Sequence, residues 1–238
     1  MINNILSKQI TMSHTKVIVI SKRLAEAGIS EYLYALQRGR EFRPSSFIVV
    51  SNEPPDEYLK NVKPLLESSP AKYYGDIPIV ADQKNEVMGA AVFKDEKMVG
   101  TLNGTESVVF QMVTGDFRYS YMTVADPYDE NFVIVLDVTQ RRNPLINVEL
   151  VDGIANVHIV IDLEADFSSI QSDQNYEDYP EIVEQKAEEM IEGEVLKLLE
   201  KTRDEFNSDI CGIGSIVKRK FLTWDSWEKY DWFSQYKN

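Results

Sequence analysis

A long amphipathic helix that follows several short strands is the feature that most limits what this chain can fold into. From Pro180 to about residue 207, apolar residues recur at helical spacing, and charged residues fill the opposite face. The apolar positions are Ile182, Val183, Ala187, Met190, Ile191, Val195, Leu198, Leu199, Thr202 and Phe206. A stripe of this length has to be covered, and after several strands the simplest cover is one face of an antiparallel sheet. We therefore expect the stripe to be buried against a sheet built from residues 87 to 163.

The residues before this helix predict a series of strands. Apolar runs at 87–93 and 98–102 flank a four-residue turn and indicate a β-hairpin. Further strands are expected at 108–113, 119–124, 131–139, 147–150 and 154–163, followed by an acidic loop at 168–179. These elements and the long helix define a C-terminal α+β domain over 86–238.

The N-terminal part shows a different order of elements. Two β-branched runs, 17–20 and 46–50, flank a helical pattern that Ser21 can cap and that Gly28 weakens or splits. This β-α-β order predicts parallel strands. Pro54 and Pro55 open a further helix that carries Tyr58, Leu59 and Val62.

A connector rich in proline and serine, at 64–85, ends the N-terminal part. We therefore expect a partial N-terminal α/β domain with its connector over 1–85. The fold class that follows is α/β and α+β: a partial β-α-β layer, then a mostly antiparallel sheet packed by the long helix.

The charge of the chain limits its partners. A formal net charge of -14 excludes nucleic acid, whose phosphates require a dense cationic surface. It also disfavours attraction to an anionic membrane by charge alone. No apolar run of the sequence is long enough to span a bilayer.

The residue types that carry enzyme chemistry are scarce. The single cysteine, Cys211, has only His14 and His158 as possible partners, and neither is near it in the sequence. Metal ligands do not cluster either, since the acidic group around Glu177 lacks the spacing of a calcium loop. We expect a protein that is not an enzyme, with no catalytic, cofactor-binding or metal-binding residues.

Two C-terminal features allow more than one interpretation. Gly212 and Gly214 resemble the start of a dinucleotide-binding fingerprint, but they follow a helix, which favours a helix-ending turn. We expect at least one of them to have a positive φ and the residues 215–220 to form an edge strand. The aromatic cluster from Trp224 to Phe233 is either a last core layer or a surface that binds a sugar, a lipid headgroup or a partner.

Three sequence motifs resemble those of a known protein family. The run D-I-C-G-I-G at 209–214, with V-K-R-K at 217–220 and Trp224, is similar to the "D-I-F-G-F-G... R-K... W" signature of C subunits of Ger-type spore germinant receptors. The residues G-A-A-V-F-K at 89–94, K-M-V-G-T-L at 97–102 and Glu106 resemble a second motif of that family.

The start of the chain carries the third motif. The run L-A-E-A-G at 24–28, Arg38, Arg43 and the strand at 46–50 resemble the family's N-terminal domain. The resemblance runs in order from about Lys16 to about Trp232, which is nearly the whole chain.

The resemblance implies a function. It suggests a non-enzymatic accessory or scaffold subunit of a nutrient germinant receptor, which works with integral-membrane subunits in spore germination. Such a protein is a lipoprotein on the outer face of the inner spore membrane. The printed chain has no signal peptide or lipid-modified cysteine at its start, so we expect it to be truncated at both ends relative to the family, as a fragment or a divergent paralogue.

Two other functions stay open at this point. An extracytoplasmic solute-binding module would use a cleft at the connector 64–85, with a few convergent polar groups. A hydrolase would need a carboxylate pair in a cleft with perturbed pKa values. A scaffold should instead expose an apolar or aromatic patch.

Overall fold

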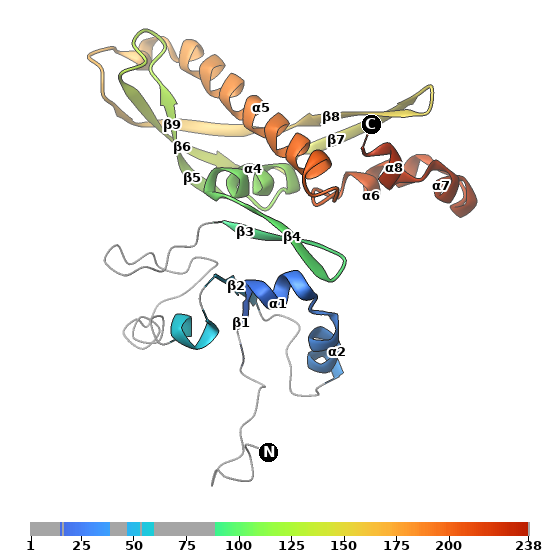
Figure 1. Cartoon of the computed structure of the whole chain (residues 1–238). Helices are drawn as coiled ribbons and strands as arrows, with labels where there is room; N and C mark the ends of the chain where they lie inside the picture. The colour runs from blue at the N-terminus through green and yellow to red at the C-terminus, as the bar shows by residue number, and fades with distance from the viewer. Residues whose placement is uncertain (1–14, 16, 39–46, 53, 60–88, 238) are drawn as a thin grey trace. The chain divides into compact units, whose positions relative to one another are not determined.

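The chain forms two units, Met1–Thr101 and Leu102–Asn238, which we describe one at a time. The computed structural model describes residues 15, 17–38, 47–52, 54–59 and 89–237 (Figure 1). It is a mixed helix-and-sheet fold with antiparallel sheets and one long helix, as the sequence predicts. The predicted connector and the domain boundary near residue 85 lie outside the described residues.

A parallel strand pair organises the start of the first unit. Strands β1 (Val17–Ser21) and β2 (Phe47–Ser51) pair in parallel, with Val17 opposite Phe47, which confirms the predicted β-α-β order. The Ser21 hydroxyl accepts a hydrogen bond from the Leu24 backbone N–H at 3.3 Å and caps α1 (Lys22–Ala27). Gly28, at φ 122°, ends that helix before α2 (Ser30–Arg38), so it splits the helical pattern in two.

The predicted hairpin is present, with a turn of two residues where four were expected, and the predicted strand residues 87 and 88 lie outside the described part. Strands β3 (Ala90–Lys94) and β4 (Lys97–Leu102) make a two-stranded sheet around a turn at Asp95, whose φ is 54°. The Ile29 backbone N–H donates to the Glu96 carbonyl at 3.0 Å, which ties this turn to the start of α2. Residues 55–59 are helical, as expected after the two prolines, while Val62 lies outside the described part.

The second unit opens with a helix where the sequence predicts a strand. Residues 108–113 belong to α4 (Gly104–Thr114), so the strand prediction for this segment is wrong. Val109, Met112 and Val113 are buried at helical spacing. The helix wins because both of its ends are capped: Asn103 and Glu106 form a capping box, and Gly115 closes the other end in the left-handed conformation at φ 82°.

Three antiparallel strands form the main sheet of this unit, in the order β5-β6-β9. They are β5 (Tyr119–Ala125), β6 (Val133–Gln140) and β9 (Leu163–Ile170). Alternate residues of β6 are buried, beginning with Ile134 and Leu136, and the residues between them are half-buried. The acidic loop predicted from residue 168 starts later, because β9 continues to Ile170 and is followed by the short 3-10 helix η2 (Tyr176–Asp178).

The long helix α5 (Pro180–Asp204) covers one face of this sheet together with α4. Met112 of α4, Leu136 of β6 and Val183 of α5 belong to one core cluster, against which Met190 and Ile191 pack. Val183 and Leu198 are buried, while the remaining stripe residues that we expected in the core, Ile182, Met190, Ile191 and Leu199, are half-buried. The burial prediction is therefore confirmed in its main point, but the covered sheet differs from the predicted residues 87–163. It is formed by β5, β6 and β9 and extends to Ile170, while β3-β4 and β7-β8 are sheets of their own.

A buried carboxylate fixes the loop after β5 to the segment that leads into α5. The two oxygens of Asp126 accept hydrogen bonds from the hydroxyls of Tyr176 and Ser172, each at 2.5 Å, and from the backbone N–H groups of Tyr128 and Asp129. Burial alone raises the pKa of this carboxyl, but the four donors outweigh it and the pKa is lowered. Burial and the Asp126 carboxylate raise the pKa of Tyr176 to about 12, so its hydroxyl stays a donor.

A two-stranded ribbon continues from the main sheet (Figure 1). Strands β7 (Leu145–Val151) and β8 (Ile154–Val160) pair antiparallel and turn at the tip through Asp152 and Gly153, which both have positive φ. The strand expected over 154–163 ends at Val160 as β8, and the next strand, β9, begins at Leu163. His158 is exposed on β8, opposite Asn147.

Short helices complete the second unit (Figure 1). They are α6 (Ile213–Val217), the 3-10 helix η3 (Lys218–Lys220), α7 (Trp224–Tyr230) and α8 (Trp232–Gln235). The edge strand expected at 215–220 is wrong, because this segment is helical throughout.

The burial of Leu198 gives a direct test of how α5 is held. Leu198 is 1% exposed, so Leu198→Ala removes packed methyl groups and should lower the free energy of unfolding by about 2–5 kcal/mol. Leu196 lies on the same helix but is 54% exposed, and Leu196→Ala should change it by less than about 0.5 kcal/mol. Urea denaturation followed by circular dichroism measures both variants, and equal effects at the two positions would contradict this packing.

Candidate functional site

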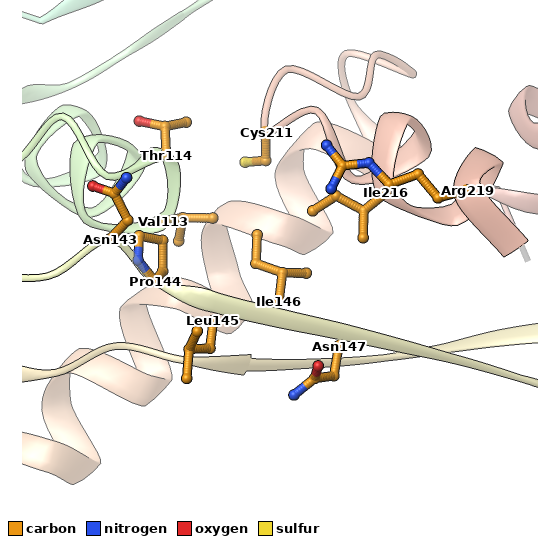
Figure 2. A pocket seen from close by; sticks show the side chains of 10 residues that line it. All are labelled: Val113, Thr114, Asn143, Pro144, Leu145, Ile146, Asn147, Cys211, Ile216 and Arg219. Atoms are coloured by element: carbon orange, nitrogen blue, oxygen red, sulfur yellow. The ribbon is translucent and has the colours of Figure 1, made fainter.

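An open pocket lies where the end of α4, the start of β7 and the residues around α6 meet (Figure 2). Its volume is about 510 Å³. Thr114, Asn143 and Asn147 line one part, and Cys211 and Arg219 line another. The side chains of Asn143, Asn147 and Arg219 are exposed, so the polar groups lie at the rim.

The chemistry of this pocket is limited by its residues. None of its lining side chains is a carboxylate or a histidine. Burial, with a smaller contribution from the Asp209 charge, raises the pKa of the Cys211 thiol to about 12. A thiol held in its protonated form is a poor nucleophile at neutral pH, which favours a packing role for Cys211.

The other residues considered for chemistry are dispersed. Within the described residues, His, Cys, Asp and Glu nowhere gather in a group of three or more that could hold a metal ion. Glu177 and Asp178 are exposed in η2, and Glu181 lies in the first turn of α5, where a negative charge is favourable at a helix N-terminus. His158 is exposed on the ribbon, and His14 lies outside the described residues.

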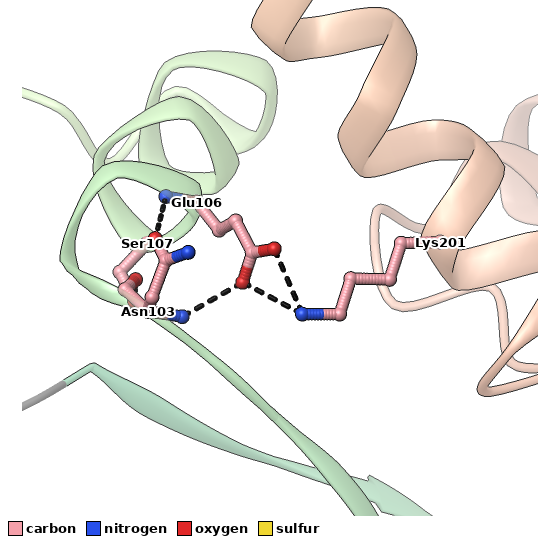
Figure 3. A network of polar contacts seen from close by, with 4 residues as sticks. All are labelled: Asn103, Glu106, Ser107 and Lys201. Atoms are coloured by element: carbon pink, nitrogen blue, oxygen red, sulfur yellow. Dashed lines mark hydrogen bonds and ion pairs between the residues drawn. The ribbon is translucent and has the colours of Figure 1, made fainter.

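The motif that ends in Glu106 builds a joint between two helices (Figure 3). The Glu106 carboxylate accepts from the Asn103 backbone N–H at 2.7 Å, while the Asn103 side chain accepts from the Glu106 backbone N–H at 2.9 Å. The ammonium of Lys201, on α5, lies 2.8 and 2.9 Å from the two Glu106 oxygens. One carboxylate thus caps α4 and ties it to α5 across 95 residues of sequence.

The electrostatics of this joint favour the charged carboxylate. Burial raises the pKa of Glu106, but the hydrogen bonds from Lys201 and Asn103 and the Lys201 charge outweigh it, and the pKa is lowered from its ordinary 4.5. The two side chains are only 19% and 23% exposed, so solvent screens the pair less than a surface ion pair.

The signature at 209–214 builds a second joint, between α5 and the C-terminal helices. The Asp209 carboxylate accepts from the backbone N–H of Ile213 at 2.9 Å, from that of Gly214 at 2.5 Å and from the ring N–H of Trp232 at 3.1 Å. An aspartate that accepts from the first N–H groups of α6 starts a helix there. This contact is the physical reason that residues 215–220 are helical and not an edge strand.

Gly212 and Gly214, the two glycines of this signature, are required for different structural reasons. Gly212 has a φ of 72°, which confirms the expected left-handed turn. Gly214 has an ordinary helical backbone, but a Cβ at this position would overlap the Trp232 ring nitrogen and come within 2.9 Å of Asp209. The motif therefore needs glycine once for conformation and once for space, at the start of a helix that follows another helix and not a strand.

The aromatic cluster is divided between the two interpretations left open by the sequence. Trp232 is buried against Asp209, and Trp227 packs edge-on against Phe221 with ring centroids 5.6 Å apart. Trp224, by contrast, is 58% exposed. The tryptophan that contacts Asp209 is Trp232, a partner that the sequence could not identify because the contact spans 23 residues.

The Glu106–Lys201 pair predicts a pH-dependent contribution to stability. Glu106→Gln keeps the capping oxygen but removes the charge, and should lower the free energy of unfolding at neutral pH by about 1–2 kcal/mol. Because the folded-state pKa is lowered, the contribution is fully present above pH 4.5 and is lost as the pH falls through the folded pKa. The difference in free energy of unfolding between wild type and variant, measured by urea denaturation across pH, should therefore become smaller as the pH falls.

A matched control is available on α5. Glu194 pairs with Lys197 three residues away, and the Lys197 side chain is 72% exposed. Glu194→Gln should change the free energy of unfolding by less than about 0.5 kcal/mol. An equal loss at Glu106 and Glu194 would show that the Glu106 pair is an ordinary surface contact.

The close approach at Gly214 predicts opposite effects of one substitution at two sites. Gly214→Ala should lower the free energy of unfolding by about 1–3 kcal/mol, because Trp232 has to leave its place. Gly193, in the middle of α5, has free space around it, so Gly193→Ala should raise it by about 0.5–1 kcal/mol. Thermal unfolding followed by circular dichroism tests both, and a neutral Gly214→Ala would refute the joint.

Comparison with known proteins agrees with these motifs. A family model described as "Spore germination B3/ GerAC like, C-terminal" matches residues 88–238, and one described as "Spore germination protein N-terminal domain" matches residues 1–88. Comparison with curated proteins gives no match. A solved structure described as "Crystal Structure of the GerBC protein" is similar with a TM-score of 0.69 and 18% identity, over 94% of this chain and 75% of that one.

The two kinds of comparison carry different weight. At 18% identity, the likeness to the solved structure shows the fold alone. The family models, which together match the whole chain, show the family. The chain therefore belongs to the GerAC-like family of spore germination proteins, the C subunits of germinant receptors.

Proposed function

We propose that this chain is a non-enzymatic accessory subunit of a nutrient germinant receptor and acts as a scaffold for the integral-membrane subunits. The observation that carries the proposal is the structural role of the residues in the family motifs. Glu106, Asp209 and Gly214 all hold helices together and none lines a reactive centre. A protein whose characteristic residues serve its own rigidity is suited to present surfaces to partners.

The location follows from the same proposal. The subunit acts at the outer face of the inner spore membrane, where the receptor's integral-membrane subunits reside. Within the residues that the structure describes, no helix has the length and apolar character needed to cross a bilayer. The proposed position is peripheral, held by partners and by the lipid anchor that the family implies.

The described residues favour a scaffold over an enzyme. The pocket beside Cys211 offers no carboxylate or histidine, and its thiol is held in the protonated form by burial. The carboxylates with lowered pKa values in the protein core and helix joint, Asp126 and Glu106, are each occupied by structural donors. Neither is free to act as a general acid or base in a cleft.

The geometry of the described residues supports a solute-binding module less well than a scaffold. Its expected cleft at 64–85 lies outside the described residues. The pocket of the second unit has its polar groups at an exposed rim, whereas a solute site has a few polar groups that converge in a mostly enclosed space.

Co-purification tests the proposed function. The tagged full chain is expressed with the integral-membrane subunits of a germinant receptor from the same genome, and the membranes are solubilised in detergent. We expect the membrane subunits to be recovered in stoichiometric amounts with the tag. A tagged lipoprotein of unrelated fold is the control for carry-over. Recovery no higher than this control would contradict the proposal, and saturable binding of a germinant to the isolated chain would favour the solute-binding module.

A further inference from the structure

One short segment of the second unit, residues 218–224, combines cations with exposed apolar side chains. Lys218, Arg219 and Lys220 are three consecutive exposed cations in η3. Leu222 follows at 101% exposure, as open to solvent as in an extended chain, and Trp224 is 58% exposed. We call these five residues the basic-aromatic patch.

The patch is held in place by its neighbours. Phe221, in extended conformation, turns inward and packs against Trp227 and Tyr230, with ring centroids 5.6 and 4.8 Å away. Thr223 caps α7 by accepting from the Ser226 backbone N–H at 3.2 Å. With the residues on both sides fixed, the side chain of Leu222 is presented to solvent by a defined loop.

The charged and apolar parts of the patch lie together. The Lys218 ammonium lies 4.4 Å from the centroid of the Trp224 ring, within the range of a cation–π contact. Lysine and arginine stems extend apolar surface while their charged ends reach polar groups. Tryptophan is suited to the headgroup level of a bilayer because its ring is apolar, and the Trp224 ring N–H donates to the Glu228 carboxylate on the same helix.

The charge of the patch is opposite to that of the protein. The chain carries a net charge of -14, yet three adjacent positions of η3 are all positive. An anionic surface repels most of such a molecule and attracts this segment, so the charge distribution itself orients the patch toward that surface. Because the rest of the molecule is repelled by an anionic surface, charge alone would hold this segment weakly, and exposed apolar side chains beside it would strengthen the attachment.

We propose that the basic-aromatic patch binds the headgroup region of an anionic lipid bilayer, with Leu222 and Trp224 inserted and the three cations on lipid phosphates. Lysine is depleted in the cores of protein–protein interfaces, whereas lysine beside exposed leucine and tryptophan suits a lipid surface. The inference rests on the proposed function, which puts the chain beside a membrane, and it adds a contact made by the polypeptide itself.

Vesicle binding tests the patch. The full chain, without lipid modification, is sedimented with vesicles of phosphatidylcholine and phosphatidylglycerol in equal parts, and with vesicles of phosphatidylcholine alone. We expect binding to the anionic vesicles that weakens as salt is added. The triple variant Lys218→Gln, Arg219→Gln, Lys220→Gln should lower the partition coefficient by at least about tenfold, and Leu222→Ser with Trp224→Ser by about tenfold.

Matched variants control for net charge and for exposed apolar surface. Arg141→Gln, Arg142→Gln and Lys186→Gln together make the same change in net charge at exposed or half-exposed sites outside the patch, and Leu196→Ser removes another exposed leucine. Both controls should bind vesicles as the wild type does. The proposal is overturned by absence of binding to anionic vesicles, by an equal loss in the controls, or by patch variants that alter self-association and leave lipid binding unchanged.

The test separates this inference from the proposed function. Co-purification in detergent involves no bilayer, so patch variants that fold should still recover the membrane subunits. If they recover them but wild type does not bind vesicles, the patch inference fails and the proposed function stands. If wild type binds vesicles through the patch but recovers no membrane subunit, the proposed function fails and the lipid contact remains.

Discussion

The packing of α5 on the three-stranded sheet is the constraint on which the rest of the second unit depends. The sheet has only β5, β6 and β9, which is too few to bury a core without a cover. Val183 and the half-buried residues around Met190 supply that cover at one end, and α4 completes it.

Polar contacts then fix the positions that apolar packing leaves adjustable. Asp126 ties the entry of α5 to the sheet, Glu106 ties its later turns to α4, and Asp209 ties its exit to α6 and Trp232. Each is a carboxylate with several donors, so each is a directional contact that specifies one arrangement. The hydroxyl pair of Thr202 and Tyr236, 2.6 Å apart, adds a further link between α5 and the C-terminal segment. This pattern of rigid joints is what the proposed scaffold requires.

The sequence predicts elements well where one period dominates and poorly where local contacts decide. The stripe of α5 and the parallel pair β1 and β2 were evident from periodicity and order. The run at 108–113 is apolar and β-branched enough to resemble a strand, and only the capping box at Asn103 with Gly115 signals the helix α4. The helical course of 215–220 depends on Asp209 and on space at Gly214, and the partner Trp232 is too distant in sequence to be identified by spacing.

The burial of Cys211 has a practical consequence for studying this protein. It is the chain's single cysteine, it lies inside the joint between α5 and α6, and its high pKa keeps it protonated. Cys211 is largely buried at the wall of the open pocket, so a maleimide or disulfide reagent meets a thiol that is mostly covered and protonated. Its labelling rate therefore rises when that wall opens, and slow labelling reports an intact joint. A second cysteine introduced at an exposed position should react much faster than the natural one, so that it can carry a fluorophore or cross-linker selectively.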